Sequence, residues 1–379
     1  MDWTALRGRW FKPRATGSGN VPPPRVAVVT DSSCSLPSGW AGSERMAALV
    51  RIVPMPVMIG EQIYGEGTDK MIAALALALA QGQDVRTSRP APGQFEAVYA
   101  ELAAAGYAAV VSVHLSGKLS GTVDSARLAA RTAQIPVQVI DTASVAMGLG
   151  FAVEAAAAAA ADGAEARDVA FAATSCAAAA NILFYVPSLE QLRRGGRIGA
   201  AAGWFGTLLA VKPILAIRDG LVVPIERVRT APKALARLEE LCRAELDART
   251  GPVRVAVHHF GNEAEAERLA SAVIRERPDT SVLLCPLPAV LAAHAGLGVL
   301  AVAVSPAVMP NLNESGQARL AGDPQADTGG AAQEAAPLAG SIPGTALTDT
   351  TGSTGTGSGR PGVPGVAGRR DLDPESDID

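Results

Sequence analysis

The chain has 379 residues, 48% of them hydrophobic and 18% charged, and its formal net charge at pH 7 is −4. A chain of this size and composition buries at least one large core, which argues against a fibrous or wholly disordered protein. The mild acidity argues against a nucleic-acid-binding surface, because such surfaces carry a clustered excess of Lys and Arg. Neither a nucleic-acid partner nor a role in transcription is expected, and the sequence shows no helix-turn-helix signature.

The four cysteines, Cys34, Cys176, Cys242 and Cys285, lie far apart in the sequence. They form neither a CxxC pair nor a disulfide framework. Free cysteine is among the most buried residue types, so these are predicted to be reduced packing residues. A reducing compartment follows, and the cytoplasm is the expected location.

Two stretches of the chain bear on targeting and membrane insertion. Residues 1–24 are basic but lack a continuous apolar segment, so no secretory signal peptide is expected. The stretch Pro286–Pro310 has about the length of a membrane span. Pro288, His294 and Gly296 interrupt it, which favours a loop followed by a buried strand over Val299–Val304. No integral membrane segment is therefore predicted.

Composition divides the chain into a body with a segment on either side. Residues 1–24 are predicted to be a flexible leader, and residues 309–379, rich in Gly, Ser, Thr, Asp and Pro, a disordered tail. The body exceeds one average domain, so two domains are expected from its length. The pattern changes after about residue 165, which predicts an N-terminal domain over 25–165 and a C-terminal domain over 166–308.

Within the body, short aliphatic runs alternate with Ala- and Leu-rich segments of helical length, which is typical of an α/β fold. Strands are predicted at Arg25–Val29, Leu49–Ile59, Ala108–Val113, Val137–Ile140, Ile182–Val186, Pro213–Ile217, Leu221–Ile225, Val253–His258, Ser281–Cys285 and Val299–Val304. Helices include Gly93–Ala104, Gly121–Thr132, Ala146–Ala161, Ala231–Leu246 and Asn262–Arg275. The first four strands indicate a doubly wound parallel sheet. Asp219-Gly220 indicates a hairpin turn and hence a second, α+β domain with a mixed sheet.

Hydroxyl-rich loops follow the predicted strands, where ligands bind in open α/β sheets. They lie at Thr30–Ser33, Thr87-Ser88 and His114–Thr122. A strand-to-helix junction attracts anions such as carboxylates or phosphates, because the first amides of a helix lack intrahelical acceptors. Ser, Thr and Asp are also ordinary helix N-cap residues, and spacing does not choose between the two interpretations.

Several familiar catalytic motifs are absent from the sequence. Gly117-Lys118 is followed by leucine where a Walker loop needs Ser or Thr, and no GxGxxG follows the first strand. Ser116-Gly117 and Ser120-Gly121 lack the preceding glycine of a hydrolase G-x-S-x-G turn. The four histidines form no metal-binding motif, so no metal and no cofactor are expected. An α/β enzyme acting on a small carboxylated or phosphorylated substrate remains an open alternative.

Read in order, eight stretches of the chain resemble the DegV family. They are VAVVTDSSCSLP (Val26–Pro37), IVPMPVMIGEQIYGEG (Ile52–Gly67), TSRPAPGQF (Thr87–Phe95), HLSGKLSGTVDSA (His114–Ala126), VIDTASVAMGLG (Val139–Gly150), YVPSLEQLRRGGRIG (Tyr185–Gly199), RVRTAPKAL (Arg227–Leu235) and HAGLGVL (His294–Leu300). The resemblance implies a two-domain DegV-like fold that binds one long-chain fatty acid in a tunnel between its domains. It also implies a lipid-binding subunit that is not catalytic alone.

The resemblance further implies a partner, a separate ATP-binding fatty acid kinase subunit that converts the presented carboxylate into an acyl phosphate for phospholipid metabolism. Matching motif to motif places the fatty acid carboxylate at Thr87, Ser120 and His294. Ser88, Gly121 and Thr122 are then expected beside it. Contact with a membrane is expected to be transient, for exchange of the acyl chain.

Two further groups of residues follow from the family match. The tunnel is expected among the apolar segments Ile182–Val186 and Trp204–Ile217 of the C-terminal domain. A surface for docking the kinase is expected around Arg229, with Arg227 and Arg197 in the same basic group. The competing interpretation of these arginines is an ordinary solvated surface.

Overall fold

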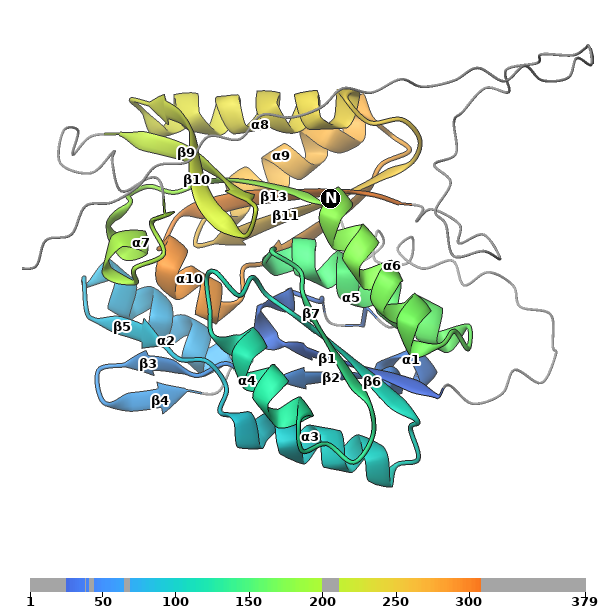
Figure 1. The fold of residues 1–379 in the computed structure, drawn as a ribbon. Helices are drawn as coiled ribbons and strands as arrows, with labels where there is room; N and C mark the ends of the chain where they lie inside the picture. The colour runs from blue at the N-terminus through green and yellow to red at the C-terminus, as the bar shows by residue number, and fades with distance from the viewer. Residues whose placement is uncertain (1–24, 38, 41–43, 65–68, 200–210, 308–379) are drawn as a thin grey trace, which may run out of the picture. The chain divides into compact units, whose positions relative to one another are not determined.

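The computed structural model describes residues 25–37, 39–40, 44–64, 69–199 and 211–307 (Figure 1). All of them belong to one compact unit, Met1–Ala321. The predicted leader over 1–24 and the predicted tail over 309–379 lie outside the described residues. The domain boundary between residues 165 and 166 stays a prediction.

The N-terminal part is built on a four-stranded sheet in the order β2-β1-β6-β7, in which every pair is parallel. Its strands are β1 (Val26–Asp31), β2 (Val50–Val53), β6 (Ala109–His114) and β7 (Val137–Asp141). Both β1 and β6 are buried along their whole length, as expected for a parallel sheet covered on both faces. The predicted doubly wound parallel sheet is confirmed.

The C-terminal part is built on a six-stranded sheet in the order β10-β9-β8-β13-β11-β12. Its strands are β8 (Asn181–Tyr185), β9 (Lys212–Arg218), β10 (Leu221–Val228), β11 (Val253–Phe260), β12 (Ser281–Pro286) and β13 (Val299–Pro306). Only β11 and β12 pair in parallel, so the sheet is mixed, as predicted. The hairpin between β9 and β10 turns at Asp219 and Gly220, whose φ angles are 49° and 76°. Positive φ at both positions is what a two-residue hairpin turn of type I′ requires.

A third, three-stranded sheet in the order β4-β3-β5 was not predicted. It consists of β3 (Val57–Ile59), β4 (Gln62–Tyr64) and β5 (Val85–Thr87), paired antiparallel. The prediction of a single strand over Leu49–Ile59 is wrong, because that run supplies β2 to one sheet and β3 to another. Pro54 and Pro56 lie between the two strands, and proline cannot donate to a sheet ladder.

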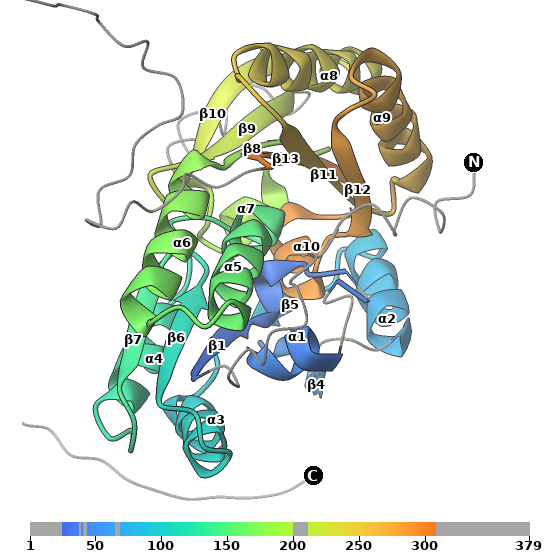
Figure 2. The same cartoon turned by 90° about the vertical axis from the view of Figure 1, so that its right-hand side faces the viewer.

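The helices form layers around the two large sheets (Figures 1 and 2). Helices α5 (Ala146–Ala161) and α6 (Ala166–Ala179) pack on each other and contact strands of both sheets. Helices α3 (Pro92–Ala104) and α4 (Thr122–Ala130) cover the outer face of the four-stranded sheet. Helices α8 (Ala231–Asp247) and α9 (Glu263–Glu276) cover the outer face of the six-stranded sheet. The smaller elements are η2 (Ser32–Cys34), α1 (Glu44–Leu49), α2 (Asp69–Ala80), α7 (Glu190–Arg194) and α10 (Ala289–Ala295).

Helix α10 corrects the prediction of a loop before the last strand. The segment Ala289–Ala295 is helical after Pro288 and ends at Gly296, whose φ is 87°. Proline before the first turn and glycine after the last are common helix boundaries, so the residues that argued against a membrane span also delimit this helix. The helix contacts α7, α2 and β5.

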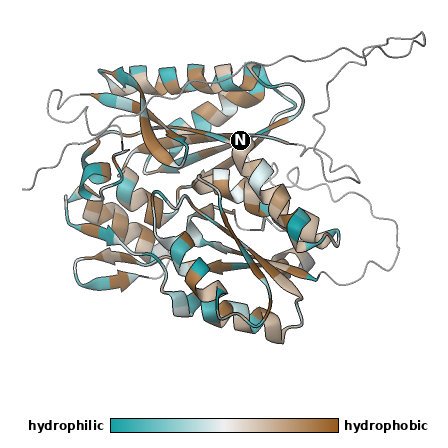
Figure 3. Cartoon of the chain, in the orientation of Figure 1, coloured by the Kyte–Doolittle hydropathy of each residue, from teal (hydrophilic) through white to brown (hydrophobic). Residues whose placement is uncertain are grey.

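The hydrophobic pattern matches these layers. In Figure 3 the strands are mostly hydrophobic, whereas α8 alternates between hydrophobic and hydrophilic residues. The buried residues of α8 recur every four positions, at Ala234, Leu238, Cys242 and Leu246, which places them on one face toward the sheet.

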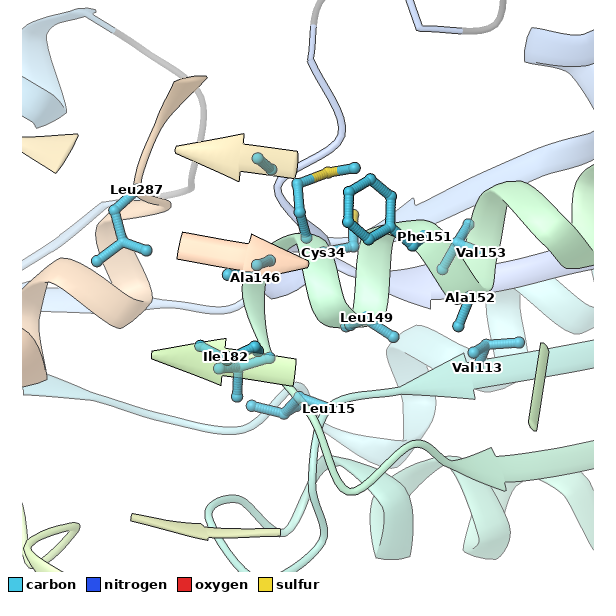
Figure 4. Close-up of a cluster of buried hydrophobic side chains, with 14 of the residues drawn as sticks. Cys34, Val113, Leu115, Ala146, Leu149, Phe151, Ala152, Val153, Ile182 and Leu287 are labelled. Carbon is cyan, nitrogen blue, oxygen red and sulfur yellow. The ribbon is translucent and has the colours of Figure 1, made fainter. Parts of the chain in front are cut away.

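The largest core cluster joins the two halves through α5, and Figure 4 shows part of it. Small residues allow this close packing. A Cβ at Gly148 would collide with Ser144 Oγ and Ile182, and one at Gly150 would collide with the Cys34 carbonyl. Helix α5 thus fixes the N-terminal sheet against the strand β8 that begins the second sheet.

Candidate functional site

An apolar pocket lies between the two halves, beside α10. It contains about 770 Å³ of space outside the protein atoms, solvent at its mouth included. All but four of the described residues that line it are apolar: Met55, Leu115, Leu119, Val145, Ala146, Ile182, Phe184, Leu192, Ile217, Val222, Leu287, Val290, Leu291, Ala295, Val299 and Ala301. The four others are Thr87, Ser120, Arg197 and His294. Such a lining suits a hydrocarbon with one polar end.

Thr87 and His294 meet at this pocket although 207 positions separate them in the sequence. Thr87, the last residue of β5, lies with its Oγ1 2.8 Å from Nε2 of His294. Burial, and to a smaller extent the nearby charge of Arg197, lower the pKa of His294 to about 4. The imidazole is therefore neutral at pH 7, with one ring nitrogen protonated as a donor and the other free to accept.

The position of His294 depends on the chain turn after α7. A Cβ at Gly195 would collide with Nδ1 of the His294 ring, so only glycine leaves the ring its place. Gly196 follows with φ of 71° and turns the chain toward Arg197. Gly195 therefore leaves room for the His294 ring, and Gly196 allows the turn that brings Arg197 to the pocket.

Ser120 lies on the loop between β6 and α4, which several hydrogen bonds hold in place. Ser120 N donates to the Ser116 carbonyl at 3.1 Å, and Ser116 Oγ donates to the Gly220 carbonyl of the β9–β10 turn at 2.7 Å. The hydroxyls of Ser120 and Thr122 are 2.9 Å apart. The hairpin of the second sheet thus positions a loop of the first.

The other three residues that were predicted beside the carboxylate are not among the described lining residues of the pocket. Ser88 is exposed, is not among the described lining residues, and donates its hydroxyl to the Arg89 carbonyl at 3.2 Å. Thr122 is buried and is linked to the pocket through Ser120. Gly121 lines an adjoining groove instead of the pocket. The structure therefore brings Thr87, Ser120 and His294 together and leaves Ser88 outside.

Arg197 lies at the pocket, although it was predicted to belong to the docking group. Its Nε donates to the Leu119 carbonyl at 3.0 Å, and Nη1 donates to the Gly195 carbonyl. Arg227 and Arg229, in contrast, are exposed residues at and just beyond the end of β10. The sequence signal that could have separated them is the Gly-Gly pair before Arg197, because a tight turn there folds the arginine back onto the body.

Asp31, in the first hydroxyl-rich loop, belongs to a buried polar network and is not itself among the described lining residues. Its Oδ2 lies 3.0 Å from Nδ1 of His114 and accepts the Leu115 amide at 3.1 Å. Nε2 of His114 lies 2.7 Å from Ser112 Oγ, which lies 2.8 Å from the Tyr99 hydroxyl. All these side chains are buried. The network satisfies buried polar groups at the ends of β1 and β6.

Comparison with known proteins decides the family. A family model for uncharacterised proteins of the DegV family matches residues 25–307. The chain belongs to the DegV family. A DegV domain-containing protein of Streptomyces coelicolor is 44% identical over 281 residues, which cover 74% of this chain and 98% of that protein. One from Mycobacterium tuberculosis is 36% identical over 288 residues, which cover 75% of this chain and 99% of that protein.

Solved DegV-family structures share the fold. A fatty acid binding DegV-family protein from Thermus thermophilus has a TM-score of 0.68 and 33% identity, with 74% of this chain and 99% of that chain covered. DegV from Bacillus subtilis, a fatty acid binding protein, has a TM-score of 0.66 and 29% identity. The match covers 74% of this chain and 99% of that chain. DegV-family proteins homologous to this chain thus bind fatty acids.

None of the helices described for this DegV-family chain is both long and apolar enough to span a membrane. In the same part of the chain, no group of three or more His, Cys, Asp and Glu side chains is placed to hold a metal ion.

Proposed function

We propose that this DegV-family chain binds one long-chain fatty acid in the apolar pocket, with the carboxylate held by Thr87, Ser120 and His294. The observation that carries this proposal is the pocket lining, in which the few polar groups are neighbours. Thr87 bonds His294, the charge of Arg197 acts on His294, and Arg197 bonds the carbonyl of Leu119, next to Ser120. The fatty acid binding of the Thermus and Bacillus proteins supports it.

The apolar wall supplies most of the affinity in this proposal. Burying around fifteen methylenes at about 0.8 kcal/mol each gives an upper limit of about 12 kcal/mol. Ordering the flexible chain and fixing its position reduce that sum substantially. Thr87, Ser120 and His294 then determine which end of the fatty acid enters last and where its carboxylate lies.

The second part of the proposal is that the bound carboxylate is presented to a separate ATP-binding kinase subunit. A carboxylate oxygen attacks the γ-phosphorus of ATP, the bond from that phosphorus to the β,γ-bridging oxygen breaks, and ADP leaves. The product is an acyl phosphate, and no proton is needed for the balance. The sequence supports a separate kinase because it contains no Walker motif and no GxGxxG follows the first strand.

The polar groups suit a carboxylate that must react. Thr87, Ser120 and neutral His294 are uncharged groups, and they orient the anion without a direct ion pair, which would stabilise the ground state more than the transition state. The hydrogen bonds recorded for Arg197 go to backbone carbonyls. We place the reaction in the cytoplasm, where ATP is available; the four cysteines, all free and buried, suit a reducing compartment.

Lipid content tests the first part. Protein purified, denatured and extracted should release about one fatty acid per chain by mass spectrometry. Thr87→Ala and Ser120→Ala should each lower fatty acid affinity roughly 10- to 150-fold, because a hydrogen bond to a charged group contributes roughly 1.5–3 kcal/mol. Titration with a fluorescent fatty acid measures the change.

Ser88→Ala is the matched control, since it removes an exposed hydroxyl next to Thr87 in the sequence but outside the pocket lining. Its affinity should stay within about twofold of the wild type, an order-of-magnitude expectation for an exposed substitution. A protein that stays empty after incubation with fatty acids would contradict lipid binding and favour an enzyme acting on a small carboxylated or phosphorylated substrate. Equal losses in all three variants would contradict the assigned head-group site.

Docking to the kinase is tested at Arg229. Arg229→Ala should leave the bound lipid in place but slow acyl-phosphate formation, because an exposed arginine can speed encounter with an acidic partner surface. Raising the ionic strength should slow the wild type more than the variant, since salt screens the contact that the variant lacks. Coupled ADP release, measured across a salt series, gives both rates.

Arg275→Ala, which removes an exposed arginine on α9, is the control and should behave as the wild type. If Arg229→Ala and the wild type show the same salt dependence, Arg229 does not dock the kinase. Loss of lipid from Arg229→Ala would assign the residue to the fold instead.

A further inference from the structure

One wall of the apolar pocket is the chain turn that enters α5. Val145 and Ala146 both line the pocket, and Figure 4 labels Ala146 at the start of the helix. Val145 is extended, with φ of −148°, and Ala146 follows with φ of 50°, in the left-handed region. A left-handed alanine costs free energy, so its surroundings must hold it there. The position of this wall therefore depends on what anchors the turn.

The turn has no local helix cap. The first backbone amides of a helix lack intrahelical acceptors, and a Ser, Thr, Asp or Asn at the N-cap commonly accepts one of them. The N-cap of α5 is Val145, which makes no side-chain cap bond and lines the pocket instead. An acceptor for the first amides of α5 must therefore come from another part of the chain.

His258 supplies that acceptor from the six-stranded sheet. Its Nε2 accepts the amide of Met147, the second residue after Val145, at 3.3 Å. The two residues are 111 positions apart in the sequence, and both are fully buried. A tertiary contact thus replaces the local cap and connects the pocket wall to β11.

The imidazole of His258 is in the state that this contact needs. Burial, and to a smaller extent the neighbouring His259, lower the pKa of His258 to about 3, so the ring is neutral at pH 7. Because Nε2 accepts an amide hydrogen, the ring proton lies on Nδ1. Nδ1 faces Cys285 Sγ at 3.2 Å and Ser35 Oγ at 3.4 Å, which fixes the orientation of the ring. His258, Cys285 and Ser35 are not among the described lining residues of the pocket.

We propose that His258 is a positioning residue for acyl binding, which holds the Val145–Ala146 wall through the Met147 amide and so limits the width of the pocket. This inference rests on the proposed function and adds a residue that does not contact the ligand. With the wall fixed, an unbranched alkyl chain fits beside it and a bulky group at the same point does not. Without the acceptor at His258, the strained turn relaxes and the pocket widens there.

Stearic acid that carries a nitroxide ring near the carboxylate, at mid-chain or near the methyl end measures this width, with plain stearic acid titrated in parallel. Wild type should bind the ring at least about tenfold more weakly at the position that faces the wall, because a packed site resists added bulk. His258→Phe keeps a ring but removes the acceptor. It should reduce that penalty roughly 3- to 10-fold, as expected for the loss of one hydrogen bond. The mobility of the nitroxide, read from its EPR spectrum, should rise at the same position.

Matched variants separate positioning from stability. A variant that is merely less stable loses affinity for all four acids in proportion, so the penalty stays unchanged. His258→Gln retains a side-chain acceptor and should keep the wild-type penalty. His259→Phe is the control for His258→Phe and should bind every acid as the wild type does, because alternation along β11 directs the adjacent side chain to the other face.

Ala146→Gly tests the wall without removing its anchor. Glycine adopts the left-handed conformation freely, so the turn gains freedom and loses a methyl group from the wall. The penalty should fall as in His258→Phe. Ala143→Gly is the control, since Ala143 has the same φ of 50° but is not among the described lining residues.

Each outcome bears on a different claim. Wild type that binds none of the four acids would overturn the proposed function. Wild type that binds stearic acid and accepts the ring equally at all three positions would overturn the fixed wall alone. An unchanged penalty in His258→Phe, or an equal fall in His258→Gln, would show that the acceptor does not position the wall. If His258→Phe does not fold, an unchanged penalty in Ala146→Gly would overturn the inference in its place.

Discussion

Replacing Asp31 by alanine is expected to lower the free energy of unfolding by about 3–5 kcal/mol, the range for breaking a buried polar pair by removing one partner. Asp31 and His114 are fully buried. The carboxylate accepts the amides of Ser33 and Leu115 at 3.1 Å each and lies 3.0 Å from His114 Nδ1. Alanine leaves all of these donors unpaired in a site that water does not reach.

Urea unfolding followed by circular dichroism measures this change. Asp124→Ala is the control, because Asp124 is exposed on α4 and faces Arg127 at 3.5 Å. Its effect should stay below about 0.5 kcal/mol, as for exposed ion pairs on a helix. Similar shifts for the two variants would show that the Asp31 network contributes little to stability.

The Asp31 network also reaches the site. Leu115, whose amide Asp31 accepts, begins the loop that carries Ser120 and itself lines the pocket. The Thr142 hydroxyl donates to the His114 carbonyl at 2.8 Å, which ties the end of β7 to the same loop. An Asp31 variant that still folds should therefore bind fatty acid less tightly, although Asp31 does not contact the ligand.

Local sequence signals predicted much of the fold. The Asp219-Gly220 hairpin was found because two residues alone set the turn, and helix α5 was predicted with its observed bounds, Ala146–Ala161. The errors occurred where hydrophobicity is continuous but the chain changes partners. Between Val53 and Val57 the only sequence signals are Pro54 and Pro56, and which sheet each flanking run joins is a long-range choice.

The site was less accessible to local reasoning. Thr87, Ser120 and His294 come from three distant segments, and only the family resemblance placed them together. Spacing could not do so, because the contact of Thr87 with His294 depends on how α10 packs against β5. Arg197 was assigned to the surface because charge suggests exposure, whereas the Gly195-Gly196 turn returns it to the pocket. Ser88 was expected beside the carboxylate together with Thr87, but alternation along an extended chain directs adjacent side chains to opposite sides.

Filling the pocket should abolish tight binding without unfolding the protein. Ala295, the last residue of α10, lines the pocket and is partly exposed, so a larger side chain there has room to adjust. An indole at Ala295→Trp occupies space that the acyl chain would use. Excluding four methylenes costs about 3 kcal/mol, roughly a hundredfold in affinity. Fluorescent fatty acid titration and lipid content by mass spectrometry measure the loss.

The control for Ala295→Trp is Ala104→Trp, at the exposed end of α3, which should bind as the wild type and melt at a similar temperature. A series of acyl lengths separates two causes of a loss. If the indole blocks the tunnel, long chains should lose far more affinity than eight-carbon chains, because only the long chains need the occupied space. If it instead disturbs the neighbouring His294, all lengths should lose affinity equally, since they share one carboxylate. Full lipid content in Ala295→Trp would mean that the acyl chain does not lie in this pocket.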